Sequence, residues 1–153
     1  MAGIATFIRS YVLNLPRNEM AFRADYEDLV SRQSLTTVFR PGNRVFPSWR
    51  GYKLGEIISG RIIERCGCDI QKMAPLFKGS KTPLRIAKIE VIRVAELSAE
   101  DFAGSSWDVT DLESLDLHIC KIYSKPLSEY DNMVTRISLD YLEPCKQPLA
   151  ASN

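Results

Sequence analysis

Strand-like patterns of apolar and polar residues fill most of the middle of this 153-residue chain. Residues 34–40 (SLTTVFR) and 55–67 (GEIISGRIIERCG) are rich in β-branched and aromatic side chains, which predicts two strands. Residues 84–97 (LRIAKIEVIRVAEL) carry apolar side chains on both faces and predict a central strand. Residues 132–142 (NMVTRISLDYL) alternate regularly and predict a last strand. The stretch 67–82, which is closed by KGSKTP (78–83), predicts a loop.

Helical spacing of apolar residues occurs mainly outside these segments. Residues 1–17 predict a helix packed onto the domain, with a membrane-surface or partner-binding helix as the alternative. Residues 19–32 predict a second helix, and residues 98–102 (SAEDF) a short helical turn. Thr110 and Glu113 form a capping box that predicts the start of a further helix. The apolar face expected for that helix consists of Leu112, Leu115, Ile119 and Ile122.

The order of these elements predicts an α+β fold, in which a small mixed barrel has helices at either end of its core. We expect one domain over residues 18–143, an N-terminal helical extension over 1–17 and a loose tail over 144–153. No apolar run approaches the roughly 18 residues that a membrane helix needs. The first residues also lack the features of a secretory signal, so we expect a cytoplasmic protein without a membrane partner.

Charge is distributed unevenly along the chain, although the formal net charge is only +1. Residues 32–88 contain 12 Lys and Arg against 3 Asp and Glu, and the remainder contains 8 against 16. A basic segment of this kind predicts one face that meets a polyanion and an acidic remainder that keeps the protein soluble. The alternative is that the fold scatters these cations over several faces.

Cations and aromatic rings are interleaved in the irregular segment between the first two predicted strands. Its cations are Arg40, Arg44, Arg50 and Lys53, and its rings are Phe39, Phe46, Trp49 and Tyr52. Cations follow phosphates, and rings stack on unpaired bases with about 1–3 kcal/mol each. The segment therefore predicts single-stranded RNA or a nucleoside as the partner. The alternative for Phe46 and Trp49 is a core position that caps the barrel end.

Other side chains with potential chemistry are few. Cysteines 66, 68, 120 and 145 lack zinc-site spacing, so we expect reduced thiols, no metal and no cofactor. His118 is the only histidine, and its place inside a predicted helix favours a structural or solvent-facing role over catalysis. Glu90 is predicted on the same strand face as Ile86 and Ile92. It is interpreted either as a partly desolvated functional carboxylate or as an ion-pair partner of Lys88 or an arginine.

Three stretches in this order resemble the ASCH (activating signal cointegrator homology) domain, a member of the PUA-like β-barrel group. They are residues 26–40 (YEDLVSRQSLTTVFR), 52–61 (YKLGEIISGR), and 89–97 (IEVIRVAEL) followed by 114–123 (SLDLHICKIY). The resemblance covers about residues 22–142. It implies a cleft between barrel and helices that handles RNA or nucleosides.

One branch of that family hydrolyses acetylated cytidine with a lysine, a threonine and a strand glutamate. By the resemblance, the glutamate falls on Glu90 and the threonine on Thr37, with Thr36 as the alternative. The lysine falls at Gln33 or Ser34, neither of which supplies an amine. Other members bind or cleave RNA, and this chain retains the residue types that those tasks need.

We therefore expect an RNA-binding ASCH protein, with metal-independent cleavage of single-stranded RNA in a basic cleft as an open question. For catalysis, Lys53 is expected to steady the phosphate, and Tyr52, Glu90 and Ser128 to handle or position protons. The expected nucleic-acid-binding residues are Thr37, Arg40, Arg44, Trp49, Arg50 and Lys53. The alternatives are an amidohydrolase acting on an acetylcytidine-like nucleoside and a protein-interaction module.

Overall fold

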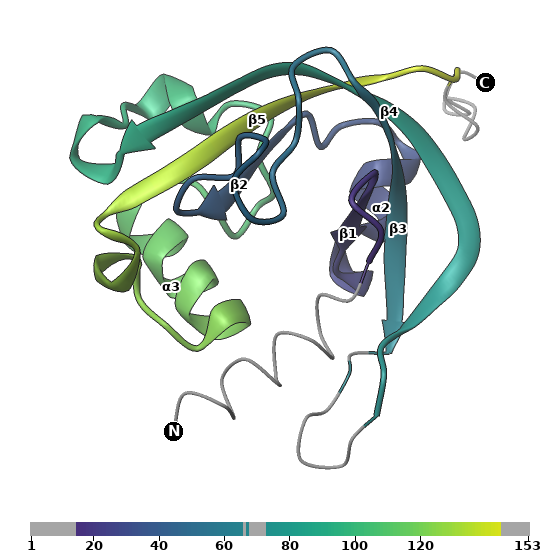
Figure 1. Ribbon diagram of the computed structural model, residues 1–153, viewed down its shortest axis with the longest axis horizontal. Coiled ribbons are helices and arrows are strands. Elements are labelled where there is room, and N and C mark those ends of the chain that lie inside the picture. Colours follow the sequence, from purple (N-terminus) through teal and green to yellow (C-terminus); the bar gives the residue numbers. More distant parts are fainter. Residues whose placement is uncertain (1–14, 66, 68–72, 145–153) are drawn as a thin grey trace.

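A five-stranded sheet with the strand order β1-β3-β4-β5-β2 forms the frame of the protein (Figure 1). The computed structural model describes residues 15–65, 67 and 73–144. The strands are β1 (Glu19–Phe22), β2 (Thr37–Pro41), β3 (Ile57–Arg65), β4 (Leu76–Arg93) and β5 (Met133–Tyr141). The α-helices are α2 (Glu27–Ser31) and α3 (Leu112–Tyr123). Four 3₁₀ turns complete the elements: η1 (Ala24–Tyr26), η2 (Val94–Glu96), η3 (Ala99–Phe102) and η4 (Leu127–Tyr130).

The sheet curls, and α3 lies across the opening from β1 and β3 (Figure 1). β1 pairs with β3 in parallel, whereas the other neighbours are antiparallel. β1 and β2 are the two edges of the sheet. The α+β prediction is confirmed at this level, as a mixed fold with a curled, barrel-like sheet. The four predicted strands are also present, with β4 in the middle of the sheet.

Two sequence-based predictions about secondary structure are wrong. The predicted helix over 19–32 begins as β1, because Glu19–Phe22 pairs with β3 and its side chains are mostly buried there; only the short α2 is helical. The predicted loop over 67–82 contains the first part of β4, which pairs with β3 from Leu76 onward despite Gly79 and Pro83. Long-range pairing therefore outweighs local preference in both segments.

The helix predicted near residue 110 is present as α3, but its cap lies one residue later than expected. Asp111 is the N-cap, and it forms a reciprocal capping box with Ser114. Leu115 and Ile119 are buried as predicted, whereas Leu112 is largely exposed. The turn predicted at SAEDF is confirmed as η3. The extension predicted over 1–17 and the tail over 144–153 fall almost entirely outside the described residues.

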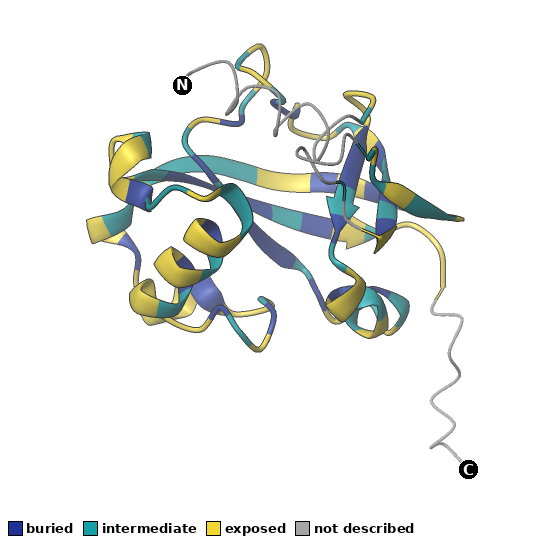
Figure 2. Ribbon diagram, turned by 90° about the horizontal axis from the view of Figure 1, so that it is seen from below, coloured by how far each residue is buried: buried dark blue, intermediate teal, exposed yellow. Residues whose placement is uncertain are grey.

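Two hydrophobic cores pack on opposite faces of the curled sheet. Buried residues are accordingly frequent along its strands (Figure 2). The inner core fills the curl and includes Met20, Phe22, Tyr26, Tyr52 and Ile137. The outer core lies under α3 and the 3₁₀ turns and includes Phe39, Phe102, Val109, Ile119 and Val134. Adjacent strand residues alternate between the two cores, as Phe39 and Val38 do on β2.

None of the helices in the described part of the chain combines the length and the apolar character needed to cross a membrane.

Candidate functional site

A cavity of about 90 Å³ lies between the edge strands and α3. That volume holds several water molecules or part of a small ligand. β1 and the following turn contribute Ala21, Phe22, Arg23 and Tyr26. The segment 35–52 contributes Leu35, Thr37, Val38, Phe39, Arg40, Arg44, Arg50 and Tyr52. The wall on the side of α3 is formed by Ser105, Ser106, Val109, His118, Ile122 and Tyr123, and Leu15 and Ile63 complete the lining.

Three arginines of this pocket have no carboxylate partner within residues 15–65, 67 and 73–144: Arg40, Arg44 and Arg50. The guanidinium of Arg40 donates to the main-chain oxygens of Phe39 and Ala21. That of Arg50 donates to the oxygen of Leu15. Arg44 is buried and the other two are half-buried, so three cations without a carboxylate partner among the described residues concentrate positive charge in the pocket.

Aromatic rings surround these cations. The Arg44 guanidinium lies 5.0 Å from the centre of the Trp49 ring and 5.8 Å from that of Tyr123, although Arg44 is only 5% exposed. The Arg50 guanidinium lies 5.7 Å from the Trp49 ring. Burial, together with the charges of Arg44 and Arg40, lowers the pKa of Arg50. Cation–π contacts of this kind offset part of the cost of burying the charges.

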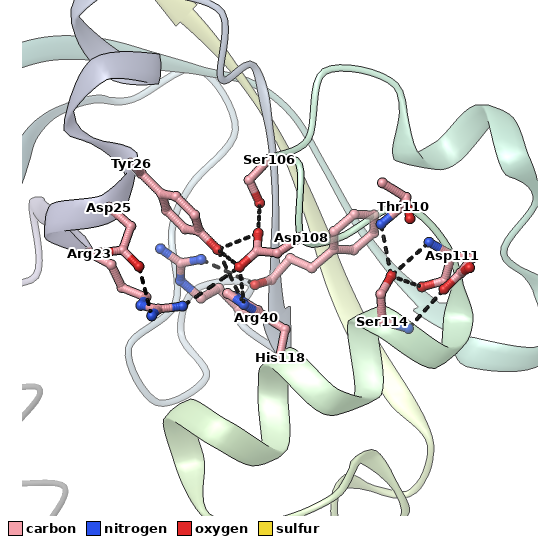
Figure 3. Close-up of polar contacts among 11 residues, drawn as sticks. Arg23, Asp25, Tyr26, Arg40, Ser106, Asp108, Thr110, Asp111, Ser114 and His118 are labelled. Carbon is pink, nitrogen blue, oxygen red and sulfur yellow. Dashed lines mark hydrogen bonds and ion pairs between the residues drawn. The ribbon is translucent and has the colours of Figure 1, made fainter.

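The opposite wall carries a cluster of hydrogen-bonding side chains centred on Asp108 (Figure 3). The Tyr26 hydroxyl donates to the Asp108 carboxylate at 2.8 and 2.9 Å, and the Ser106 hydroxyl donates to it at 2.6 Å. The Nδ1 atom of His118 lies 3.3 Å from the Tyr26 hydroxyl and 3.7 Å from Asp108 Oδ2. Arg23 also lies 3.7 Å from that carboxylate. Asp108 therefore collects contacts from three elements.

Burial and the contacts of this cluster shift the pKa values of His118, Tyr26 and Asp108. Burial, aided by the charges of Arg40 and Arg23, lowers the pKa of His118 to about 4, although Asp108 opposes the shift. Burial also raises the pKa of Tyr26 to about 12. For Asp108, burial raises the pKa, but hydrogen bonds from Ser106 and Tyr26 and the charge of His118 outweigh it, so the pKa is lowered. Near neutral pH the cluster therefore contains a neutral imidazole, a phenol and a carboxylate.

The loop before α3 brings Ser105 and Ser106 into the lining of the pocket, and Asp108 contacts that lining through Ser106, Tyr26 and His118. The loop is held there because Gly104 is fastened to the start of β2. The main-chain oxygen of Gly104 accepts from the amides of both Thr36 and Thr37. Gly104 has a φ of +84°, and a Cβ there would lie 2.2 Å from Thr36 Oγ1. Ser105 Oγ is buried and has no hydrogen-bond partner in the described part of the chain, so its hydroxyl is available to a ligand.

The structure brings five of the predicted site residues to one pocket: Thr37, Arg40, Arg44, Arg50 and Tyr52. The Thr37 hydroxyl donates to the Ala103 oxygen, and the Tyr52 hydroxyl donates to the Glu19 oxygen. Burial raises the pKa of Tyr52, although the surrounding arginines oppose that shift. Trp49 is 55% exposed, so it is not the buried core residue considered as its alternative.

The other four predicted residues do not line the pocket: Trp49, Lys53, Glu90 and Ser128. Lys53 is exposed, and its ammonium lies 4.4 Å from the centre of the Phe46 ring. Phe46 is itself 42% exposed. Ser128 is exposed on η4. Among the described residues, the lining includes no lysine and no glutamate, so the lysine, threonine and glutamate implied by the resemblance are not assembled there.

The prediction that Glu90 shares a strand face with Ile86 is wrong. A β-bulge between Ile86 and Lys88 places one extra residue on β4, which reverses the alternation beyond it. Glu90 therefore lies opposite Arg136, on the face of the outer core, with Lys88 and Arg136 3.7 and 3.8 Å from its carboxylate. Its ion-pair interpretation is the one that the structure supports.

Sequence reasoning missed the cluster on the far wall: Arg23, Tyr26, Ser105, Ser106, Asp108 and His118. One signal for His118 was available, because Ile122 was placed on the buried face of α3 and His118 lies one helical turn before it. The expectation that His118 is structural did not place it in a pocket. Within the described residues, no group of three or more His, Cys, Asp and Glu is arranged to hold a metal.

Comparisons with known proteins add little to this geometry. No family model matches the chain, and no curated protein matches it. Among solved structures, the crystal structure of an Enterococcus faecalis protein of the family DUF984 matches with a TM-score of 0.44 and 13% sequence identity. The match covers 75% of this chain and 68% of that one. A similarity of this degree assigns neither a family nor a function.

Proposed function

We propose that this protein binds single-stranded RNA through the arginine pocket, as an RNA-binding protein of ASCH and PUA-like type. The observation that carries the proposal is the convergence of Arg40, Arg44 and Arg50 on one cavity without carboxylate partners in the described part of the chain. Taking a charge out of water costs several kcal/mol unless a countercharge is present. A bound anion supplies that countercharge.

A phosphate group is the anion that these side chains suit best. The planar guanidinium donates two parallel hydrogen bonds to phosphate oxygens, and arginine stacks on aromatic rings as well. The exposed ring of Trp49 lies against two of the three guanidinium groups. A base attached to the bound phosphate therefore has a stacking surface nearby, which favours an unpaired nucleotide over an isolated anion. The resemblance of residues 22–142 to ASCH domains supports RNA as the polymer.

Anisotropy of end-labelled single-stranded RNA, titrated with protein at several salt concentrations, tests the proposal. We expect the logarithm of the affinity to fall linearly with the logarithm of salt, with a slope of roughly −1 to −2 for two or three phosphate contacts. Arg40→Gln should weaken binding and make the slope shallower. Arg85→Gln is the matched control, because Arg85 is an exposed arginine of β4 that does not line the pocket.

Two results would overturn the proposal. One is the absence of RNA binding by the wild-type protein at low salt. The other is equal loss of affinity in Arg40→Gln and Arg85→Gln, which would place binding on the general surface charge. A protein-interaction module, in contrast, predicts an affinity that changes little with salt.

A further inference from the structure

Within the part of the chain that the structure describes, the imidazole of His118 is held through one nitrogen. Its Nδ1 atom faces the Tyr26 hydroxyl and the Asp108 carboxylate. For Nε2 no hydrogen bond occurs within the described residues, and this atom is not among the buried polar atoms that lack a partner. Because His118 lines the arginine pocket, Nε2 is the ring nitrogen that a ligand can reach.

Hydrogen bonding in the cluster assigns the tautomer of this ring. The single proton of the Tyr26 hydroxyl goes to Asp108, since that contact is about 0.4 Å shorter than the one to His118. Both neighbours of Nδ1 are then acceptor oxygens, so Nδ1 carries the proton of the neutral ring and Nε2 carries the lone pair. A neutral imidazole with a free Nε2 beside a phosphate-binding pocket has the form of a general base.

We propose that His118 is the general base of a ribonuclease site in this pocket and takes the proton from a ribose 2′-hydroxyl of the bound RNA. This proposal rests on the proposed function, because Arg40, Arg44 and Arg50 would hold the phosphate that is attacked. It goes beyond that function by adding a reaction and a catalytic residue. Asp108 and Tyr26 act as positioning residues that fix the ring and its tautomer.

The reaction balances without a cofactor. His118 Nε2 takes the 2′-hydroxyl proton while the 2′-oxygen forms a bond to phosphorus. The bond between phosphorus and the 5′-oxygen of the next nucleotide breaks, and that oxygen takes a proton from water. The imidazolium returns its proton to the solvent. The products are a 2′,3′-cyclic phosphate and a 5′-hydroxyl, and the arginines and the unpartnered Ser105 hydroxyl are available to the charged phosphate oxygens.

Charged groups around His118 contribute to the pKa of its imidazole. Arg40 of β2 and Arg23, which follows β1, oppose its protonation, whereas Asp108 from the loop before α3 favours it; the phenol of Tyr26 is neutral. Arrival of an RNA phosphate neutralises part of the arginine charge, which strengthens the base when substrate is bound. Because kcat/KM reports the free protein, we expect it to rise with pH through about 4. Because kcat reports the protein with RNA bound, we expect its rise with pH to occur at a higher pH.

Cleavage is tested on labelled single-stranded RNA in EDTA, beside the same sequence in all-2′-deoxy and all-2′-O-methyl form. We expect cleavage of the RNA alone, with cyclic-phosphate ends, and binding of the 2′-O-methyl strand. His118→Gln should lose about 100-fold or more in cleavage rate and keep its RNA affinity within about 3-fold. Lys121→Gln, an exposed position on the same helix, is the control and should leave the rate unchanged.

The wild-type protein provides a second measurement that does not depend on how a variant folds. Because the chain has a single histidine, nitrogen NMR of histidine-labelled protein reports His118 directly. We expect the Nδ1-protonated tautomer at neutral pH, and a shift toward the other tautomer in Asp108→Asn. Rescue of cleavage by Asp108→Glu, but not by Asp108→Asn, would mark a positioning carboxylate.

The outcomes separate this proposal from the proposed function. RNA that is bound but not cleaved, cleavage that persists in His118→Gln, or an Nε2-protonated ring would each overturn the assignment of His118 and leave RNA binding intact. Failure to bind RNA at all would overturn both proposals.

Discussion

The guanidinium of Arg40 on β2 donates a hydrogen bond to the main-chain oxygen of Ala21 on β1, across 3.2 Å. β1 and β2 are the two edges of the curled sheet, so this side chain bridges them. Arg40 also lines the pocket. One residue thus contributes both to the closure of the fold and to the positive field of the candidate site.

Substitution of Arg40 should separate these two roles. Arg40→Lys keeps the charge but loses the planar fork, so we expect RNA affinity to fall about 10-fold, because charge-assisted hydrogen bonds contribute roughly 1.5–3 kcal/mol. Arg40→Gln loses the charge as well and should bind more weakly still. Anisotropy titrations measure the RNA affinity. Urea unfolding measures the free energy of unfolding, which should fall when the hydrogen bond between Arg40 and Ala21 is lost. Equal affinity of the Lys variant and the wild type would show that bidentate contact is not used.

Arg44 is expected to lower stability in exchange for binding. It is a nearly buried cation without a carboxylate partner in the described part of the chain, and such charges are often replaced by apolar side chains without loss of stability. Arg44→Met should therefore raise the free energy of unfolding by about 1 kcal/mol while reducing RNA affinity. Chemical denaturation and binding are measured on the same preparation. A loss of more than about 1 kcal/mol of stability would contradict the prediction.

His118 should make stability depend on pH. The unfolded histidine binds a proton near its ordinary pKa of 6.5, whereas the folded one does so only near 4. As the pH falls through this window, the unfolded state gains a proton that the folded state lacks. The free energy of unfolding should fall by roughly 3 kcal/mol in total and become independent of this group below about pH 4. Denaturation at a series of pH values measures the effect.

His118→Gln is the control for that window. Its stability should be nearly level between about pH 6.5 and 4, apart from the contributions of carboxylates such as Asp108 at the acidic end. A wild-type curve that matches the curve of the variant would show that His118 is protonated equally in both states.

Gly104→Ala should disturb the loop that carries Ser105, Ser106 and Asp108. The added Cβ would lie 2.2 Å from Thr36 Oγ1, and the φ of +84° is unfavourable for alanine. We expect a loss of about 1–3 kcal/mol in the free energy of unfolding and weaker RNA binding. Gly79→Ala is the matched control, because no atom lies within 4 Å of the Cβ built there. Similar losses of stability in Gly104→Ala and Gly79→Ala would show that the close contact and the positive φ at Gly104 are not the cause.

Trp49→Ala should weaken RNA binding without changing its salt dependence. The exposed ring contributes stacking, at about 1–3 kcal/mol per base, and no charge, so the affinity falls while the slope against salt stays the same. Leu54→Ala, at an exposed apolar position in the same segment, should bind like the wild type. If the two variants bind equally well, Trp49 does not contact a base.

The strand pattern was predictable from sequence because each of the four predicted strands carries a strong local signal. β1 was not, since its four residues become a strand only by pairing with β3, which lies about 40 residues further along the chain. The sheet face on which Glu90 lies could not be predicted either. A single bulge at Ala87 reverses the alternation of side chains between the two faces for all the residues of β4 that follow it.

In the candidate site, too, features with a local sequence signal were predictable and features that depend on long-range contacts were not. The cations of 40, 44 and 50 were identified because they are concentrated in one segment, and the fold brings them to one pocket. Asp108 and Tyr26 are 82 residues apart in sequence and meet only through tertiary packing, so no local pattern joins them. A lone histidine within a helix carries no motif, so the sequence favours a structural or solvent-facing role for His118.

The pocket is lined by residues of both hydrophobic cores, with Phe22 and Tyr26 from one and Phe39 and Val109 from the other. A ligand that contacts both requires both to be folded at the same time, so its binding free energy opposes the local opening of either. Saturating RNA is therefore expected to slow amide hydrogen exchange in β1 and α3 together. The ligand would then act as a cooperative link between the two cores.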